Sequence, residues 1–590
     1  MIIHEAALTL RVAHDVQLTH PAGVELREPM QGIKAVVAAV DVEVRDIQQK
    51  SAAGTGANLV QKLRLAQITP DADVGRDVLE EQWLAAELAQ LAGMVSQRAC
   101  RFTRGTDRIQ MSKIGFRRAG EGNVLANPFR LGNPCDPREL PQTGWIERTG
   151  SAEAQPQAVD KQRVAGREFR ELAWMYHHRL TSLRATYFAY GRNLVGAFRK
   201  FQEQGRLEII TTAATHALLP LLNHPPSVRA QILTARDHYR SCFGCDPRGI
   251  WLPECAYVEG VESVLQEANL RWFIMDTHGL LHARPRPRYG VFAPVLTPNG
   301  IAAFARDLDS ARQVWSRNEG YPGDPRYRDF YRDVGFDLDF DYVRPYLPSP
   351  ELRGFTGLKY HRITGPTPDK ATYDRALALR AADEHASHFL EARRDQARKL
   401  GEILDRPPLL VAPYDAELFG HWWYEGPDFL DLFVRKAHYD QQDFKLVTPS
   451  DYLRENPTLQ VVRPSPSSWG EEGYWKLWLN ETNEWILPHL TVAQERMTAL
   501  ARAHPDAAGL TLRALNQAAR ELLLAQSSDW PFILRTGTSP DYARKRVKDH
   551  LLRFIALHEM LTTTRVDEPW LARVEWLDNL FPDVNYRYWA

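Results

Sequence analysis

The chain has 590 residues, and its 73 Lys and Arg against 74 Asp and Glu give a formal net charge of −1. Hydrophobic residues make up 44% and charged residues 25%, a composition typical of soluble globular proteins. A nucleic-acid-binding protein normally has a basic excess, so the charge argues against that class.

Three further features concern the compartment. No apolar run approaches the roughly 20 residues that span a bilayer, and the first 30 residues lack the apolar core of a signal peptide. Five cysteines in a chain of this length do not make a disulfide framework. We therefore expect a cytoplasmic protein without a membrane segment, either a monomer or a small homo-oligomer.

Residues 1–165 differ from the rest in their aromatic content. They hold five of the 60 Phe, Trp and Tyr residues of the chain. Each buried aromatic side chain contributes roughly 150–250 Å² of buried area, so this segment cannot build a core as the remainder does. Three interpretations stay open: weak order, a separate module, or a segment translated in an altered reading frame.

The next stretch alternates between helical and strand patterns. Apolar residues recur at helical spacing over 167–205, where Gly205 ends the run. A β-branched run over 207–212 predicts a buried strand, and 225–243 predicts a second helix. Strands that alternate with helices favour a parallel β/α architecture.

Acidic residues follow several of the predicted strands. The strands at 249–252 and 271–276 lead to Glu254 and Asp276, and the strand at 408–412 leads to Asp415. In parallel β/α barrels catalytic groups lie at the carboxyl ends of strands. Two such carboxylates near aromatic residues suggest glycoside chemistry, in which one attacks the anomeric carbon and the other transfers protons.

Helical patterns dominate the remainder. A long charged helix is expected at 370–404, and from residue 490 onward all patterns are helical, at 490–503, 510–526 and 539–563. We divide the chain into an atypical segment at 1–165, a catalytic β/α barrel at 166–455 and a C-terminal helical domain at 456–590.

Tryptophan is concentrated late in the chain. Six of the 16 Trp residues fall within 422–485, among them Trp469 in a Ser- and Gly-rich loop. Such loops usually lie at the surface, so Trp469 is a candidate for stacking on a sugar ring. Core packing is the alternative for most of the others.

Two longer motifs carry a family resemblance. Gly249-Ile-Trp-Leu-Pro-Glu-Cys-Ala-Tyr257 and Ala412-Pro-Tyr-Asp-Ala-Glu-Leu-Phe-Gly-His-Trp-Trp423 resemble the two catalytic signatures of glycoside hydrolase family 57, and in particular its 1,4-α-glucan branching enzymes. The resemblance extends over about 170–590. It implies a distorted (β/α)7 barrel followed by an α-helical domain, with no metal and no cofactor.

The resemblance also implies roles for individual residues. Glu254 matches the nucleophile and Asp415 the general acid/base, which a retaining mechanism holds about 5–5.5 Å apart. Tyr289 matches the tip of a mobile loop that favours transfer over hydrolysis. The remaining matched or neighbouring positions are expected to contact an α-glucan such as amylose or glycogen: His216, Asp276, Arg306, Trp315, His421, Trp422, Trp469, Trp478 and Asp529.

One departure from the family concerns the N-terminus. The family begins with a strand that carries a His-x-His pair, whereas this chain has only His4, His14 and His20 before residue 165. The first β/α units are therefore expected to be altered, which would expose neighbouring strand edges.

Several functions remain as alternatives: a branching transferase, an α-amylase or 4-α-glucanotransferase, and a glucan-binding protein without turnover. A metal-dependent deacetylase is weaker, because it rests on architecture alone. The Cys242-x-x-Cys245 pair has no second pair at zinc spacing, so we do not expect a structural zinc there.

Overall fold

The computed structural model describes residues 9–10, 167–316, 319–347, 351–563 and 565–590. The first described element, β1 (Thr9–Leu10), pairs antiparallel with β2 (Leu207–Glu208). The other predictions for 1–165 lie outside the described residues. Within the described residues, no helix combines the length and the apolar character needed to cross a membrane.

The helical pattern at 167–205 forms two helices instead of one, α7 (Arg167–Ala189) and α8 (Leu194–Glu203). Gly191 and Arg192 break it with φ values of +58° and +63°, which a helix does not accommodate. The Asn193 side chain then accepts a hydrogen bond of 2.8 Å from the Gly196 N–H and caps α8. As predicted, the run ends at Gly205, whose φ is +70°.

The sheet that positions the site has four strands in the order β3-β4-β6-β5. The strands β3 (Gly249–Trp251), β4 (Trp272–Met275) and β6 (Ala302–Ala305) run parallel, and β5 (Val295–Leu296) pairs antiparallel with β6. All residues of β3, β4 and β6 are buried. A parallel sheet covered on both faces requires such continuous apolar strands, which the sequence shows.

Two predicted strands are shorter or absent. The 207–212 run contributes only β2 and one parallel bridge, between Thr211 and Ile250. Residues 408–412 form an extended segment instead of a strand. Two backbone hydrogen bonds hold this segment, since the Leu409 N–H donates to the Phe292 carbonyl at 2.8 Å and the Val411 carbonyl accepts from the Asp307 N–H at 2.7 Å. A closed seven-stranded barrel stays a prediction.

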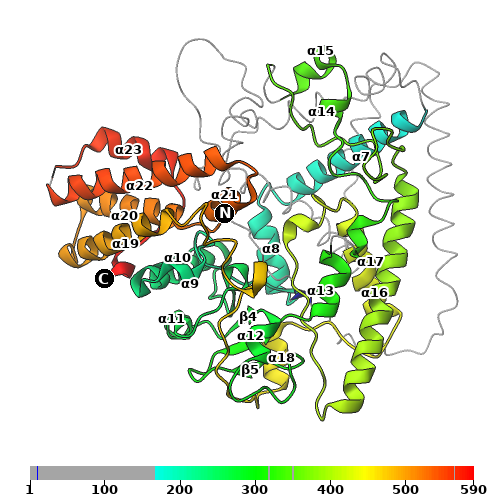
Figure 1. Ribbon diagram of the computed structural model, residues 1–590, viewed down its shortest axis with the longest axis horizontal. Coiled ribbons are helices and arrows are strands. Elements are labelled where there is room, and N and C mark those ends of the chain that lie inside the picture. The colour runs from blue at the N-terminus through cyan, green and yellow to red at the C-terminus, as the bar shows by residue number, and fades with distance from the viewer. Residues whose placement is uncertain (1–8, 11–166, 317–318, 348–350, 564) are drawn as a thin grey trace, which may run out of the picture. The chain divides into compact units, whose positions relative to one another are not determined.

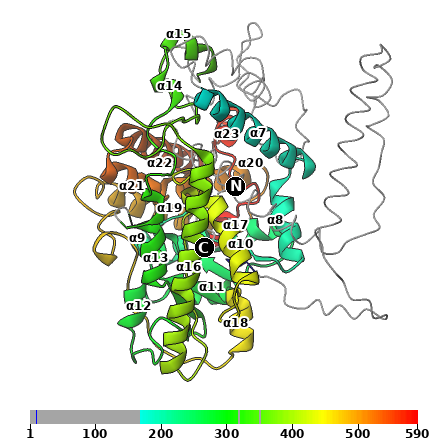
Figure 2. The same ribbon diagram turned by 90° about the vertical axis from the view of Figure 1, so that its right-hand side faces the viewer.

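Helices cover the sheet and the chain around it. The predicted helix at 225–243 is confirmed as α10 (Pro225–Phe243), and the long charged helix is α16 (Arg375–Ile403), which packs along α17 (Gly426–Tyr439) (Figures 1 and 2). Asp374 sets the start of α16, because its side chain accepts a 2.9 Å hydrogen bond from the Leu377 N–H. The other helices of this part are α9 (Leu219–Leu222), α11 (Val261–Glu267), α12 (Thr277–Leu281), α13 (Leu308–Trp315), α14 (Val334–Asp337), α15 (Phe340–Val343) and α18 (Pro449–Glu455).

The C-terminal part is helical, as predicted. Helices α19 (Ile486–Ala503), α20 (Gly509–Ala525) and α22 (Pro540–Thr562) match the three expected segments within a few residues, and α20 packs against α22 (Figure 1). Two shorter helices were not predicted, α21 (Asp529–Thr536) and α23 (Glu568–Leu577). Leu515, Leu522, Phe554 and Leu557 belong to one buried cluster that joins these helices.

Candidate active site

Glu254 lies in a sharp turn directly after β3. The turn is a short 3-10 segment, Pro253–Cys255, in which Glu254 and Cys255 have φ values of +61° and +52°. Side chains other than Gly rarely adopt this left-handed conformation, which costs on the order of 1–3 kcal/mol and is concentrated at functional sites. The turn interrupts the strand direction and holds the Glu254 carboxylate at the carboxyl end of the sheet.

The carboxylate of Glu254 is held by two residues that lie far away in the sequence. Its Oε2 accepts a 2.7 Å hydrogen bond from the indole Nε1 of Trp469, and its Oε1 lies 3.5 Å from the hydroxyl of Ser528. The backbone of Trp469 also donates to the Glu254 carbonyl at 3.1 Å. Glu254 and Trp469 are thus fixed to one another at both the side chain and the main chain.

Several charges surround Glu254. Burial raises the pKa of its carboxyl above the ordinary value of 4.5, and the carboxylates of Asp415 and Asp529 raise this pKa further. The charge of His216 and the Trp469 hydrogen bond act in the opposite direction. The structure therefore brings four predicted residues around Glu254: His216, Asp415, Trp469 and Asp529.

Asp415 lies at the start of the 3-10 turn Ala416–Leu418, which follows the extended segment 408–412. Its backbone is extended, with φ of −64° and ψ of 138°. The segment lies next to β6 through its hydrogen bond with Asp307. Two carboxylates on separate segments, close enough to interact electrostatically, can divide nucleophilic attack and proton transfer between them.

A second pair of predicted residues supports Trp469. The Arg306 Nε donates to Asp276 Oδ2 at 2.5 Å, and the Arg306 guanidinium lies 5.7 Å from the centroid of the Trp469 ring. The ring nitrogens of His278 face two acceptors, with Nδ1 at 2.8 Å from Asp276 Oδ1 and Nε2 at 2.9 Å from the Gly473 carbonyl oxygen. Asp276 and Arg306 therefore connect β4 and β6 to the loop that carries Trp469.

The C-terminal helical part supplies one side of the site. Ser528 precedes α21, and its hydroxyl lies 2.9 Å from His216 Nδ1. The Ser528 N–H also donates to the His216 carbonyl at 3.1 Å. Asp529, the first residue of α21, follows directly. The contact between Ser528 and His216 explains how Asp529, 313 positions after His216, comes close enough to raise the pKa of Glu254.

His421 and Trp422, on the segment that follows Asp415, form a separate aromatic group with Trp315 at the end of α13. The ring centroids of Trp315 and Trp422 lie 5.8 Å apart, and those of His421 and Trp422 lie 6.1 Å apart. The Trp422 N–H donates to the Glu417 carbonyl at 3.1 Å, which fixes this group to the Asp415 turn. Its glucan contacts stay a prediction.

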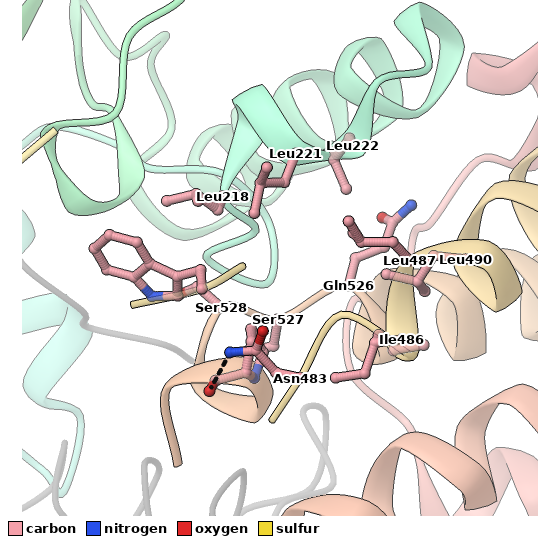
Figure 3. A pocket seen from close by; sticks show the side chains of 13 residues that line it. Leu218, Leu221, Leu222, Asn483, Ile486, Leu487, Leu490, Gln526, Ser527 and Ser528 are labelled. Atoms are coloured by element: carbon pink, nitrogen blue, oxygen red, sulfur yellow. Dashed lines mark hydrogen bonds between the residues drawn. The ribbon is translucent and has the colours of Figure 1, made fainter. Parts of the chain in front are cut away.

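Trp478 is placed differently from the expected stacking platform. Its side chain is 2% exposed and packs against Gly470, where a Cβ atom would lie 2.4 Å from the indole ring. It lines a largely apolar cavity of about 30 Å³ together with Leu218, Ile486 and Ser528 (Figure 3). A wall of this kind shapes the region beside Ser528 without presenting a free ring face.

Tyr289 is not brought to the carboxylates. Its hydroxyl donates to Asp405 Oδ1 at 2.7 Å, and the guanidinium groups of Arg288 and Arg406 flank its ring at 5.3 and 5.2 Å. Asp405 and Arg406 precede the 408–412 segment, whereas Asp415 follows it. These contacts hold Tyr289 beside the residues that precede that segment, and its role in favouring transfer stays a prediction.

Two residues of the site were not predicted from the sequence. Ser528 belongs to a stretch that carries the family resemblance, but its contact with His216 depends on tertiary structure. His278 lies two positions after Asp276, just beyond the end of β4. This position near a predicted site residue was the one feature of the sequence that could have indicated its role.

One group of potential metal ligands occurs among the described residues: Glu521, His550 and Asp578. All three are buried between helices of the C-terminal part, away from Glu254 in the sequence. His550 Nε2 accepts from Arg546 at 2.7 Å, and Arg553 pairs with Asp578. Guanidinium groups thus satisfy this cluster, which we interpret as a buried ion-pair network.

Comparison with known families gives two matches. The sequence model of glycosyl hydrolase family 57 matches residues 77–464, which begins earlier than the expected start near residue 170. A second model, described as the C-terminal part of 1,4-alpha-glucan branching enzymes, matches residues 489–589.

Curated relatives include a 1,4-alpha-glucan branching enzyme of Thermococcus kodakarensis, 33% identical over 429 residues, which are 66% of this chain and 60% of the relative. A probable 1,4-alpha-glucan branching enzyme of Mycobacterium tuberculosis is 34% identical over 363 residues, or 59% of this chain and 62% of the relative. The chain thus spans about 60% of the length of these relatives.

Solved structures are also similar. The α-amylase AmyC of Thermotoga maritima has a TM-score of 0.70 and 42% identity, over 76% of this chain and 85% of that chain. The branching enzyme of Pyrococcus horikoshii has a TM-score of 0.67 and 31% identity, over 76% and 82% of the two chains. The Thermococcus kodakarensis branching enzyme has a TM-score of 0.69 and 26% identity, over 88% and 93%.

Proposed function

The chain belongs to glycosyl hydrolase family 57, and on that premise we propose that it is a 1,4-α-glucan branching enzyme. It cleaves an α-1,4 link of an amylose- or glycogen-type glucan and transfers the severed chain to a 6-hydroxyl by a retaining double displacement. Glu254 is the nucleophile and Asp415 the general acid/base.

The observation that carries this proposal is the environment of Glu254. Its carboxylate is oriented by the indole N–H of Trp469 at 2.7 Å and lies within electrostatic reach of Asp415. A nucleophilic carboxylate must be ionised, and this hydrogen bond favours the ionised form against burial. The match of residues 489–589 to branching-enzyme C-terminal parts favours branching over other reactions of the family.

In the first step, Asp415 donates its proton to the oxygen of the α-1,4 link while a Glu254 oxygen attacks the anomeric carbon. The C–O bond to the leaving chain breaks, and an ester bond forms between the donor chain and Glu254. The N–H of Trp469 on Oε2 and the hydroxyl of Ser528 near Oε1 hold the carboxylate in position before and after this step.

In the second step, Asp415 takes the proton of an incoming 6-hydroxyl. The oxygen of this hydroxyl attacks the same anomeric carbon. The ester bond to Glu254 breaks, which restores the free carboxylate and leaves the configuration at the anomeric carbon unchanged. Water competes at this stage, so the outcome depends on how well the site excludes it. Asp276, Arg306 and His278 act as positioning residues, because they hold Trp469 and its loop.

An α-amylase is the second candidate, and the 42% identity to the Thermotoga maritima α-amylase AmyC favours it. The two reactions share the first step and differ only in the acceptor of the second. Glu254 and Asp415 would have the same roles in both. The acceptor therefore has to be measured.

The test is incubation of amylose with the purified full chain. A branching enzyme produces new α-1,6 links, counted by proton NMR, with few new reducing ends. Reducing ends without α-1,6 links would establish the amylase. No change of the glucan, with binding retained, would leave a glucan-binding protein without turnover. The Glu254→Gln variant is the control that assigns any turnover to this site.

We also propose that the enzyme acts in glycogen synthesis in the cytoplasm, as a monomer or a small homo-oligomer. Fractionation of cells and analytical ultracentrifugation test the location and the oligomeric state separately.

A further inference from the structure

A connected series of aromatic side chains leads away from the Asp415 turn. We name it the aromatic strip and define it by Trp315, Trp422, Phe330, Tyr331, Phe336 and Phe355. The first two belong to the group next to the Asp415 turn. The others lie on the chain between α13 and α16, and Phe336 is part of α14 (Val334–Asp337).

Ring contacts link the members of the strip. Trp315 lies 5.8 Å from Trp422, and His421, which lies 6.1 Å from Trp422, is 5.2 Å from Phe330. Phe330 contacts Tyr331 at 5.2 Å.

Lys359 continues the series. Its ammonium lies 4.3 Å from the centroid of Phe330 and 5.6 Å from that of Phe355. Phe355 in turn lies 4.9 Å from Phe336. The series is therefore continuous from the Asp415 turn to α14.

The outer members of the strip are exposed to an unusual degree. Tyr331 is 80% exposed, Phe355 59%, Phe336 47% and Trp422 38%. Phe336 and Phe355 contact one another directly, whereas Tyr331 and Trp422 join them through the half-buried Phe330 and His421 and the buried Lys359. Single exposed apolar residues are ordinary on protein surfaces, but several exposed rings gathered in one region mark an interaction site.

Buried polar contacts hold the backbone that carries these rings. The fully buried Asp333 accepts hydrogen bonds from the Gly335, Thr356 and Gly357 N–H groups at 2.8–2.9 Å. It thus ties the turn that precedes Phe336 to the loop that carries Phe355. The exposed rings stand on a scaffold that polar contacts define, which is how a binding surface is kept in shape without a core of its own.

The chemistry of the strip fits an α-glucan chain. The substrate is uncharged, and its sugar rings have apolar faces that pack on aromatic rings while their hydroxyls remain in water. The strip is also continuous with the Asp415 turn through Trp422, whose N–H donates to the Glu417 carbonyl at 3.1 Å. The strip thus begins beside the turn that carries Asp415.

We propose that the aromatic strip is a docking surface for a long α-glucan chain, and that Tyr331, Phe336 and Phe355 bind glucose units several positions away from the link that is cleaved. This inference rests on the proposed function for the identity of the ligand. The strip gives the enzyme a preference for long chains over short ones, because only a long chain reaches both Glu254 and these three residues.

The experiment compares the full-length wild type with Phe336→Ala/Phe355→Ala and with Tyr331→Ala. One measurement is retardation in a native gel that contains soluble amylose, which reports binding without turnover. The other is the ratio of kcat/KM for amylose to kcat/KM for maltoheptaose. The matched control is Tyr439→Ala, an equally exposed aromatic residue at the end of α17 whose ring contacts His438.

The proposal predicts that each strip variant lowers the ratio and weakens retardation, by about tenfold for the double variant, whereas Tyr439→Ala matches the wild type. Wild-type values in both strip variants would overturn it. Phe355→Leu, which keeps an apolar side chain without a ring, separates loss of stacking from loss of folding and is expected to lower the ratio as well.

Two outcomes separate this proposal from the proposed function. In one outcome, the wild type has no turnover but is retarded by amylose, and the strip variants lose this retardation. That result would support the docking surface and contradict the proposed branching activity. Turnover of amylose with an unchanged ratio would support the enzyme and contradict the strip. If the wild type is a dimer by ultracentrifugation and the strip variants are monomers with normal retardation, the surface binds a second copy, which also overturns the proposal.

Discussion

The β/α part and the C-terminal helical part are built in different ways. In the C-terminal part, long helices with buried Leu, Ala and Phe residues pack together, and their ends lie close to where the hydrophobic pattern places them. In the β/α part, the strands are short and the functional residues lie in turns and extended segments, including the left-handed turn at Glu254. The regular part is a scaffold, whereas the irregular part carries the chemistry.

The two parts meet in function through a small number of side chains. Ser528 and Asp529, at the start of α21, come from the helical part and lie beside His216 and Glu254. A helix start is a natural place for such a contribution, because its first residues combine a rigid backbone with polar side chains.

The largest effect is expected from the carboxylates of the β/α part. Glu254→Gln removes the nucleophile and Asp415→Asn removes the proton donor. We expect Glu254→Gln to abolish glucan cleavage, with a loss of at least about 10⁴-fold in kcat, and Asp415→Asn to lose about 10²–10⁴-fold. Unfolding temperatures close to that of the wild type show that chemistry was lost and not the fold. Substantial activity in Glu254→Gln would contradict the assignment.

In the helical part the largest effect is on stability. Glu521 is buried, accepts from His550 Nδ1 and Gln517 Nε2 at 2.7 Å each, and lies 3.9 Å from Arg553. Glu521→Ala leaves buried donors and a guanidinium without this partner, so we expect the free energy of unfolding to fall by about 3–5 kcal/mol. Arg513→Ala, which breaks the more exposed pairs with Glu568 and Glu575, should cost less, about 1 kcal/mol. Denaturant unfolding followed by circular dichroism measures both.

The same network gives a pH dependence whose sign can be worked out. Burial raises the pKa of Glu521 from 4.5 to about 7 in the folded chain. The folded state therefore retains this proton more strongly, and the stability contributed by Glu521 is lost as the pH rises from 4.5 through about 7. Burial lowers the pKa of His550 from 6.5 to about 3, and its contribution is lost as the pH falls through that range. Glu521→Gln should remove the first loss and keep the second.

A smaller effect concerns the acid limb of the pH profile, which is the fall of kcat/KM toward low pH. Trp469→Phe keeps a ring under Arg306 but removes the N–H that lowers the pKa of Glu254. The pKa of Glu254 should rise, so the nucleophile is protonated at higher pH and the acid limb of kcat/KM moves upward. At the pH optimum we expect kcat/KM to fall by about 10–100-fold, which corresponds to the free energy of one hydrogen bond to a charged group.

Trp478→Phe is the matched control. It also loses an indole N–H, but among the described residues that N–H has no acceptor. We expect its acid limb to coincide with that of the wild type. If both variants shift the limb equally, the hydrogen bond to Glu254 is not its cause.

The smallest effect is expected at Tyr289. Tyr289→Phe removes the hydrogen bond to Asp405 at the surface and should leave the unfolding temperature close to that of the wild type. Because the described contacts of Tyr289 are with Asp405, Arg288 and Arg406, the ratio of new α-1,6 links to new reducing ends should stay at the wild-type value. A severalfold fall of this ratio would show that Tyr289 reaches the site during turnover.

Much of the fold was accessible from local sequence patterns. The bounds of α10 and, within a few residues, of α19, α20 and α22 followed from hydrophobic periodicity, whereas the shorter α21 and α23 were missed. The break between α7 and α8 was missed, since it depends on two left-handed residues inside an otherwise periodic run. The 408–412 segment has strand composition, but its hydrogen bonds go to a loop residue and to Asp307 instead of forming a ladder.

The site was partly predictable. Glu254, Asp276 and Asp415 could be selected because each follows a predicted strand, and Trp469 because of its loop. The partner of Glu254 could not be selected from spacing, since Trp469 lies 215 positions away. The burial of Trp478 and the position of Tyr289 depend on Gly470 and Asp405, and such contacts exist only after folding.

The most direct test of the central claim is the capture of the ester at Glu254. The Asp415→Asn variant is incubated with α-maltotriosyl fluoride, whose leaving group needs no protonation, and the quenched protein is examined by mass spectrometry. We predict a mass increase of one maltotriosyl group on the peptide that contains Glu254, because attack proceeds while release lacks its base. An adduct on another residue, or none while the fluoride is consumed, would contradict the assignment.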